Sequence, residues 1–197
     1  MIITIGRECG CGADEIGKAL SEKYMLSYYA KSEIIEYAKK RGLYDKFPYF
    51  FGEIPTNSFM GPLDENVMEH IRNTPKETLG KLMEGQNCII IGRTSNYVFR
   101  DAEDALRIFL CADINYRIAQ IAKKHNISTI NARKLVEETD ERRRRYHKYY
   151  TGEEWGYAGN YALCIDVSEL GMQGVIDVID AFIKKRNMER NMKRGVR

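Results

Sequence analysis

The chain has 197 residues, of which 44% are hydrophobic and 30% are charged, and this is the composition of an ordinary globular protein with one sizeable core. No apolar run approaches the roughly 18 residues that cross a bilayer, and no leader of charged and then apolar residues precedes the first strand pattern. We therefore expect a single cytoplasmic domain without a membrane partner.

The net charge of +3 resides at the C-terminal end, because residues 184–197 hold seven Lys or Arg and one Glu. The rest of the chain is mildly acidic, so nucleic acid is not an expected partner and the basic end is interpreted as a solvated tail. Three of the five cysteines lie inside apolar runs, which favours free thiols in a reducing compartment. The sequence leaves a homo-oligomer open.

The first half of the chain predicts two strands, two helices and an irregular stretch. Residues 1–5 form an apolar run that ends at a glycine, and residues 26–29 predict a second, short strand. Apolar residues at helical spacing predict a helix from Glu15 and another over 32–40. The aromatic and proline-containing residues 44–62 are typical of a loop that packs with its own side chains.

The second half alternates helices with strands. A helix interrupted near "NTP" is predicted over 64–84. Strands are predicted at 87–92, 105–112 and 161–168, and helices at 114–124, 128–150 and 171–186. Strands that alternate with helices predict an α/β fold with a parallel sheet of five strands covered on both faces.

The segment "ITIGRECGCGADEIGKAL" has the layout of a phosphate-binding loop between a strand and a helix. Gly6, Gly10 and Gly12 allow backbone N–H groups to approach a phosphate, and the helix N-terminus adds partial positive charge. The complete motif continues with a lysine and a hydroxyl residue, whereas this chain has Ala13 and Asp14. A tight strand-to-helix turn that holds no ligand is the alternative.

An arginine follows the most β-branched strand of the chain. Ligands of open α/β sheets bind beyond the carboxyl ends of the strands, so Arg93 is expected to point into that crevice. Its planar guanidinium suits a phosphate or the edge of a nucleobase, and an arginine paired with an acid at the surface is the alternative.

The helix "EETDERRRRYHKYY" carries four consecutive arginines. The spacing i, i+4 predicts three ion pairs, Glu138–Arg142, Asp140–Arg144 and Glu141–Arg145. Arg143 has only a threonine at that offset, with Asp140 at i−3, so it is the arginine left for a ligand. The alternatives are a solvated helix face, or a nucleic-acid contact by this run together with the C-terminal tail.

Five segments in order resemble the cytidylate-kinase-like family of nucleoside monophosphate kinases. The opening "ITIGRECGCGADEIGKALSEKY" is similar to the family's glycine-loop segment, and "LSYYAKSEII" is similar to its "YYDKELI". "NCIIIGRTSNYVF" resembles the strand that ends in "GR", and "LRIFLCADINYRI" resembles the next strand and helix. "TDERRRRYHKYYTGEEWGYAGNYALCIDVS" resembles the lid and the last strand.

The resemblance implies a doubly wound α/β fold of the phosphate-loop type. The core would comprise 1–30, 86–127 and 158–186, with a monophosphate-binding insertion at about 31–85, a lid at about 128–157 and a basic tail at 187–197. Further implications are ATP and Mg²⁺ as cofactors and CMP or a related nucleotide as the acceptor.

The residues that this resemblance implies for the site fall into three groups. Gly6, Gly10, Cys11, Gly12, Ala13 and Asp14 would surround the donor phosphates; Lys31, Arg93 and Arg117 would lie at the acceptor; and Arg7, Asp140 and Arg143 would be catalytic. Clustered arginines suit phosphoryl transfer, which requires positive groups around the moving phosphate.

The chain departs from the family pattern at four positions. The loop lysine is absent at Ala13, Asp14 replaces the arginine of this branch, the aspartate of "YYDKE" is Ala30, and the aspartate after "GR" is Thr94. Two interpretations follow. In one, Arg7 replaces the lysine and Asp14 is a metal ligand of an active kinase; in the other, the protein is a nucleotide-binding or sensor module with little catalysis.

Overall fold

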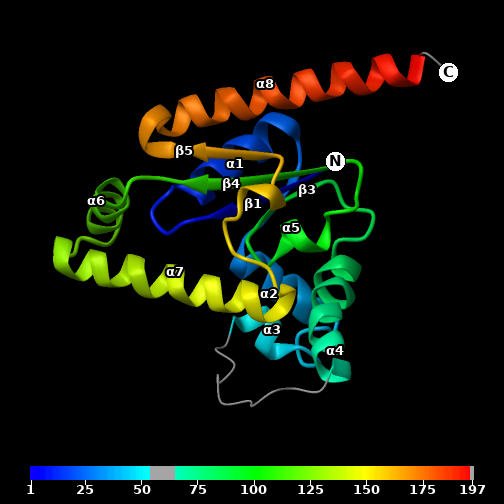
Figure 1. Ribbon diagram of the computed structural model, residues 1–197, viewed down its shortest axis with the longest axis horizontal. Helices are drawn as coiled ribbons and strands as arrows, with labels where there is room; N and C mark the ends of the chain where they lie inside the picture. Colours follow the sequence, from blue (N-terminus) through cyan, green and yellow to red (C-terminus); the bar gives the residue numbers. More distant parts are fainter. Residues whose placement is uncertain (54–64, 196–197) are drawn as a thin grey trace.

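The computed structural model describes residues 1–53 and 65–195, and its centre is a parallel sheet of five strands (Figure 1). Part of the predicted loop and insertion, residues 54–64, and the last two residues of the predicted tail lie outside the described residues. The strand order is β2-β3-β1-β4-β5. The strands are β1 (Ile2–Arg7), β2 (Ser27–Tyr29), β3 (Cys88–Ile91), β4 (Ala105–Cys111) and β5 (Leu163–Asp166).

Alternating side chains of these strands supply two separate cores. In β1, Ile3 and Ile5 pack on one face, while Ile2 packs on the other. The parallel register that aligns Ile2 with Cys88 of β3 and with Ala105 of β4 keeps this alternation in step across the sheet. Both faces are apolar, as expected for a parallel sheet that helices cover on either side.

Helices cover each face of the sheet (Figure 1). One face packs against α1 (Ala13–Tyr24) and α8 (Val167–Gly195). The other is covered by α2 (Lys31–Lys40), α3 (Pro48–Gly52), α4 (Glu65–Pro75), the π-helical turn η1 (Lys76–Gly80) and α5 (Ser95–Val98). The long helix α7 (Thr129–Thr151) follows α6 (Ile114–His125), and the 3₁₀ turn η2 (Ala158–Asn160) leads into β5.

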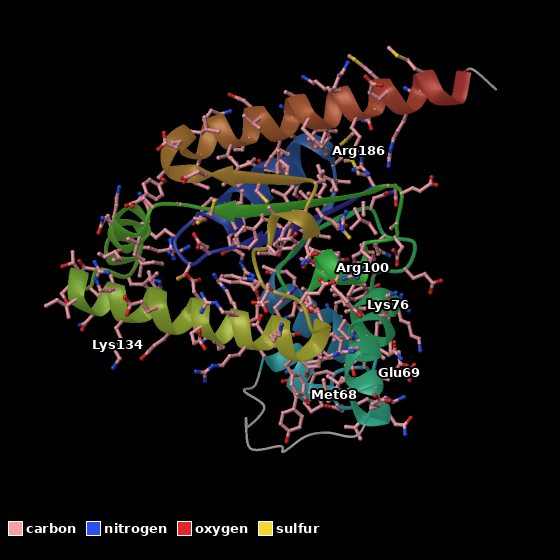
Figure 2. All side chains as sticks on the ribbon, viewed as in Figure 1. Met68, Glu69, Lys76, Arg100, Lys134 and Arg186 are labelled. Atoms are coloured by element: carbon pink, nitrogen blue, oxygen red, sulfur yellow. The ribbon has the colours of Figure 1, made fainter. Side chains whose placement is uncertain are left out.

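The five predicted strands and the alternating α/β order are confirmed, and the helices differ from the prediction in three places. The aromatic loop contains the short helix α3, and the unpredicted α5 follows β3. The last helix extends through Gly195 in place of a loose tail, with a break at Gly171. On the face of α8 toward the sheet, Arg186 donates hydrogen bonds to the carbonyls of Glu103 and Ala105, which anchors this extension (Figure 2).

All five cysteines are free thiols, as the sequence predicted. Across 1–53 and 65–195, no helix combines the length and the apolar character that crossing a membrane requires.

Leu20 tests the core between α1 and the sheet, because its side chain is fully buried. We expect Leu20→Ala to lower the free energy of unfolding by about 2–5 kcal/mol, since it removes apolar contacts and leaves a cavity. The exposed Ile130 of α7 provides the control, and Ile130→Ala should change stability by less than about 0.5 kcal/mol. Urea denaturation followed by circular dichroism measures both; equal stability losses would contradict this description of the core.

Candidate functional site

The glycine loop between β1 and α1 lies close against α6. Gly10 and Gly12 have φ angles of 93° and 66°, in the left-handed region that favours glycine. A Cβ atom on Gly10 would lie 2.7 Å from the carbonyl oxygen of Arg117, so no larger residue fits without moving α6. The loop therefore exposes backbone at the N-terminus of α1, as an anion-binding turn requires.

Two pockets open on either side of this N-terminus. The larger, about 500 Å³, is lined by the loop from residue 7 to 15, by α6 and by Arg143. The other, about 380 Å³, is lined by Tyr28, Lys31 and their neighbours. Four residues line both pockets: Arg7, Asp14, Glu15 and Lys124. The pockets thus meet at a boundary made of two cations and two carboxylates.

Arg7 lies at the end of β1 and its guanidinium packs against the backbone of Gly92. A Cβ atom on Gly92 would lie 2.1 Å from Nη1 of Arg7, so the glycine makes room for this side chain. Burial, and then the charge of Arg143, lower the pKa of Arg7 to about 10, and it stays protonated at neutral pH. Nη1 of Arg143 donates to the Arg7 carbonyl over 3.2 Å, which brings the two arginines together.

Arg93 follows β3 at the same end of the sheet as Arg7, and its side chain is 1% exposed. Its backbone is left-handed, with a φ of 57°, and this directs the chain sharply after β3. Nη1 lies 2.6 Å from Oε1 of Glu53, and Nζ of Lys31 lies 3.9 Å from Oε2 of the same carboxylate. Arg93 also shares a narrow cavity with Arg7 and Arg143. Three arginines from β1, the β3 end and α7 therefore converge at one place.

Asp140 of α7 holds the loop in position. Its Oδ1 accepts the backbone N–H of Cys9 over 2.7 Å, and its Oδ2 accepts Nη1 of Arg117 over 2.5 Å. Arg143 lies 3.6 Å from Oδ1 on the same helix. Arg117 also donates from Nε to the Ala112 carbonyl. One buried carboxylate thus joins the loop, α6 and α7.

The structure brings together most of the residues that the sequence singled out. Arg7, Gly10, Cys11, Gly12, Ala13, Asp14 and Arg143 line the larger pocket, Lys31 lines the second, and Gly6 and Arg93 line the narrow cavity. Arg117 has a different position from the one expected at the acceptor. It lies behind the glycine loop, 8% exposed, with its guanidinium engaged by Asp140 and Glu8.

Of the three ion pairs predicted within α7, the one between Glu141 and Arg145 is present. The prediction for Asp140 and Arg144 is wrong, because Asp140 turns inward to the loop and Arg144 pairs with Glu141. The prediction for Glu138 and Arg142 is wrong as well, since Glu138 pairs with Lys134, which Figure 2 shows on the outer side of the helix.

Asp14 is exposed in the first turn of α1, and its Oδ1 accepts a hydrogen bond of 2.8 Å from the hydroxyl of Tyr28. No group of three or more His, Cys, Asp or Glu side chains with metal-binding geometry exists within 1–53 and 65–195. Mg²⁺ commonly takes one or two carboxylates together with substrate phosphates and water. Asp14, one of the two carboxylates at the pocket boundary, fits that mode of binding, in which the phosphates would complete the coordination.

Sequence reasoning missed Glu53, Lys124 and Tyr28. Nζ of Lys124, at the end of α6, lies 3.0 Å from Oε1 of Glu15 and so reaches the loop. Glu53 belongs to no motif, and in the sequence it stands between Gly52 and Ile54, after an aromatic run. Tyr28 lay within a matched segment, but nothing in its spacing pointed to Asp14. Each contact joins residues that are far apart in the sequence or lie outside any motif, so the sequence around each residue could not predict it.

The Asp140 contacts predict a large cost for removing one carboxylate. Asp140→Ala leaves the buried Arg117 without its shortest ion pair and the Cys9 N–H without an acceptor, and we expect a loss of about 3 kcal/mol or more in the free energy of unfolding. The neighbouring Glu141→Ala breaks only exposed pairs and should cost less than about 1 kcal/mol. Chemical denaturation compares the two variants. If they were equally stable, Asp140 would not organise the loop.

The chain is similar to known proteins in sequence and in fold. The family model described as the cytidylate kinase-like family matches residues 2–169. Cytidylate kinases of Pyrococcus horikoshii and Methanococcus vannielii are 26% and 28% identical over 93% of this chain, and the matches cover 88% and 100% of those proteins.

Solved structures share the fold of this chain. A crystal structure of an uncharacterized protein from Eubacterium ventriosum has a TM-score of 0.69 at 25% identity, and the match covers 94% of this chain and 98% of the other. A gluconokinase from Sinorhizobium meliloti 1021 has a TM-score of 0.53 at 10% identity over 96% of this chain and 95% of its own, and shares the fold. Because the family model spans most of its length, the chain belongs to the cytidylate kinase-like family.

Proposed function

We propose that this protein is a nucleoside monophosphate kinase that transfers the γ-phosphoryl group of ATP to CMP or a related acceptor, with Mg²⁺. The observation that carries the proposal is that two pockets meet at Arg7 and the first turn of α1. A donor in the larger pocket and an acceptor in the second would have their phosphates face one another at this boundary. Membership of the family supports the same reaction, and the free thiols favour a cytoplasmic location.

The larger pocket suits the triphosphate of the donor. Gly10 and Gly12 leave the backbone accessible, and the N-terminus of α1 contributes partial positive charge. Its lining holds four Lys or Arg side chains and three Asp or Glu side chains, so protein charge alone falls short of neutralising a triphosphate. Mg²⁺, when bound with Asp14 as a ligand, would neutralise charge on the β- and γ-phosphates.

Arg7 and Arg143 are the proposed catalytic cations. An oxygen of the acceptor phosphate forms a bond to the γ-phosphorus while the bond from phosphorus to the bridging oxygen breaks, and ADP leaves. Negative charge is spread over the transferred oxygens in the transition state, so cations fixed beforehand stabilise it most. Arg7 is held against Gly92, and Arg143 is held by the Arg7 carbonyl and Asp140.

The remaining assignments divide the chain between donor and acceptor. Residues 31–85 are proposed as the acceptor-binding insertion, with Lys31 and the buried Arg93 directed to the acceptor phosphate. Residues 128–157 are proposed as the lid, which carries Arg143 over the reacting groups. Asp140 and Arg117 are positioning residues, because they act on the loop through Cys9.

Arg143 offers a direct test of the reaction. With ATP, CMP and Mg²⁺, Arg143→Ala should lower kcat by roughly a thousandfold, because the transition state loses a preorganised cation. The matched control is Arg144→Ala, which removes an exposed arginine paired with Glu141 and should keep kcat within about twofold. A coupled assay for ADP measures both. Folded wild-type protein that phosphorylates none of the common monophosphates would exclude the proposed function.

Asp14 distinguishes metal binding from repulsion of the phosphates. If Asp14 is a ligand, Asp14→Asn should raise the Mg²⁺ concentration for half-maximal activity by about tenfold or more. If the carboxylate repels the donor, the same variant should bind ATP more tightly in the absence of Mg²⁺. Activity across a Mg²⁺ titration, together with calorimetry of ATP binding in EDTA, separates these outcomes, and Tyr28→Phe controls for loss of the hydrogen bond to Asp14.

A further inference from the structure

Glu53, at the C-terminal end of α3, places a carboxylate in the middle of the arginine cluster. Its Oε1 lies 2.6 Å from Nη1 of Arg93 and its Oε2 lies 3.9 Å from Nζ of Lys31. The Glu53 side chain is 14% exposed, while that of Arg93 is 1% exposed. The contact is therefore a largely desolvated ion pair, in contrast to the exposed pairs on the outer side of α7.

The surrounding charges keep Glu53 ionised. Burial by itself raises the pKa of this carboxyl, and the charges of Arg93, Arg7, Lys31 and Arg143 together lower it further than burial raises it. Four cations from β1, α2, the β3 end and α7 thus act on one carboxylate. Coulomb attraction of this kind is strong where water is excluded, so the cluster favours an anion at its centre.

Arg93 has donor groups that Glu53 leaves unused. Nη1 is close to the carboxylate and the Tyr146 side chain also interacts with the guanidinium, but none of its nitrogens forms a hydrogen bond of good geometry within the described part of the chain. A phosphate presents more oxygens than a carboxylate and accepts bidentate hydrogen bonds from arginine. The site is therefore better matched to a phosphate than to the carboxylate that occupies it.

The cavity beside Glu53 is too small to hold both anions. It measures about 20 Å³ and is lined by Arg7, Arg93, Arg143 and Glu53 among others. That volume has room for about one water molecule, and a phosphate group is larger. A phosphate can therefore reach Arg93 only if the Glu53 carboxylate moves out of its present position.

We propose that Glu53 is a specificity-determining residue. Its carboxylate occupies the site where the phosphate of the acceptor binds, and it must be displaced when the acceptor binds. A free phosphate ion would have to displace Glu53 with its own contacts alone. A nucleoside monophosphate also gains contacts from its sugar and base, so the exchange favours the complete nucleotide over small anions. This inference rests on the proposed kinase function for the identity of the acceptor.

The test replaces the carboxylate by an amide of the same shape. Inorganic phosphate should raise the unfolding temperature of Glu53→Gln at concentrations roughly tenfold lower than those needed for the wild type, because the competing charge is gone. The control is Glu154→Gln, which removes a carboxylate paired with the exposed Lys148 and should respond to phosphate as the wild type does. Sodium chloride at equal ionic strength is run in parallel.

A second variant covers the case in which Glu53→Gln is unfolded without phosphate. Glu53→Asp keeps the charge but shortens the reach to Arg93, and it should respond to phosphate between the wild type and Glu53→Gln. Recovery of folded Glu53→Gln by added phosphate also supports the proposal. An unchanged phosphate response in whichever of these variants is folded would overturn it.

Kinase assays keep this inference distinguishable from the proposed function. If the wild type phosphorylates CMP but Glu53→Gln shows no gain in phosphate response, Glu53 is not the displaced group while the kinase function stands. If Glu53→Gln gains phosphate affinity but neither the wild type nor any variant phosphorylates a monophosphate, the role of Glu53 at the anion-binding site is supported and the proposed kinase function is excluded. If the inference about Glu53 and the kinase function are both correct, inorganic phosphate should compete with CMP and inhibit Glu53→Gln more strongly than the wild type.

Discussion

The geometry of the site depends on the contacts that the Asp140 carboxylate makes. This carboxylate accepts the N–H of Cys9 from the glycine loop and the guanidinium of Arg117 from α6, and it lies 3.6 Å from Arg143 on its own helix. These contacts are buried, where a charge left without its partner is costly. The carboxylate therefore fixes the loop and the proposed lid relative to one another, and the distances between the arginines follow from that arrangement.

The site gathers cations and balances each with a carboxylate. Asp140 serves Arg117 and Arg143, while Glu53 serves Arg93 and lowers the cost of burying the neighbouring Arg7. The carboxylates lower the cost of burying the arginine charges away from water, yet a phosphate can compete with them for any of these arginines. In the proposed kinase reaction, these carboxylates would pair with the arginines whenever no phosphate is bound.

Sequence periodicity and glycine placement were enough to predict the five strands and the glycine turn between β1 and α1, because each depends on residues that are neighbours in the chain. The helix spacing rule failed at Asp140 and Arg144 for the opposite reason. It counts partners on one helix, whereas Asp140 meets the N–H of Cys9, more than a hundred residues away in sequence. The position of Arg117 behind the loop could not be predicted for the same reason, because it depends on the close approach of α6 to Gly10.

The α/β order, the loop at the carboxyl end of β1 and the family could all be predicted from the amino-acid sequence, because they depend on local patterns and ordered motifs. Which charged side chains form pairs depends on the folded chain. The tertiary structure directed Asp140 inward, placed Arg7 against Gly92 and set Glu53 on Arg93. The physical reason is that an ion pair in a folded protein depends on distance and burial in space, and neither can be read from separation along the chain.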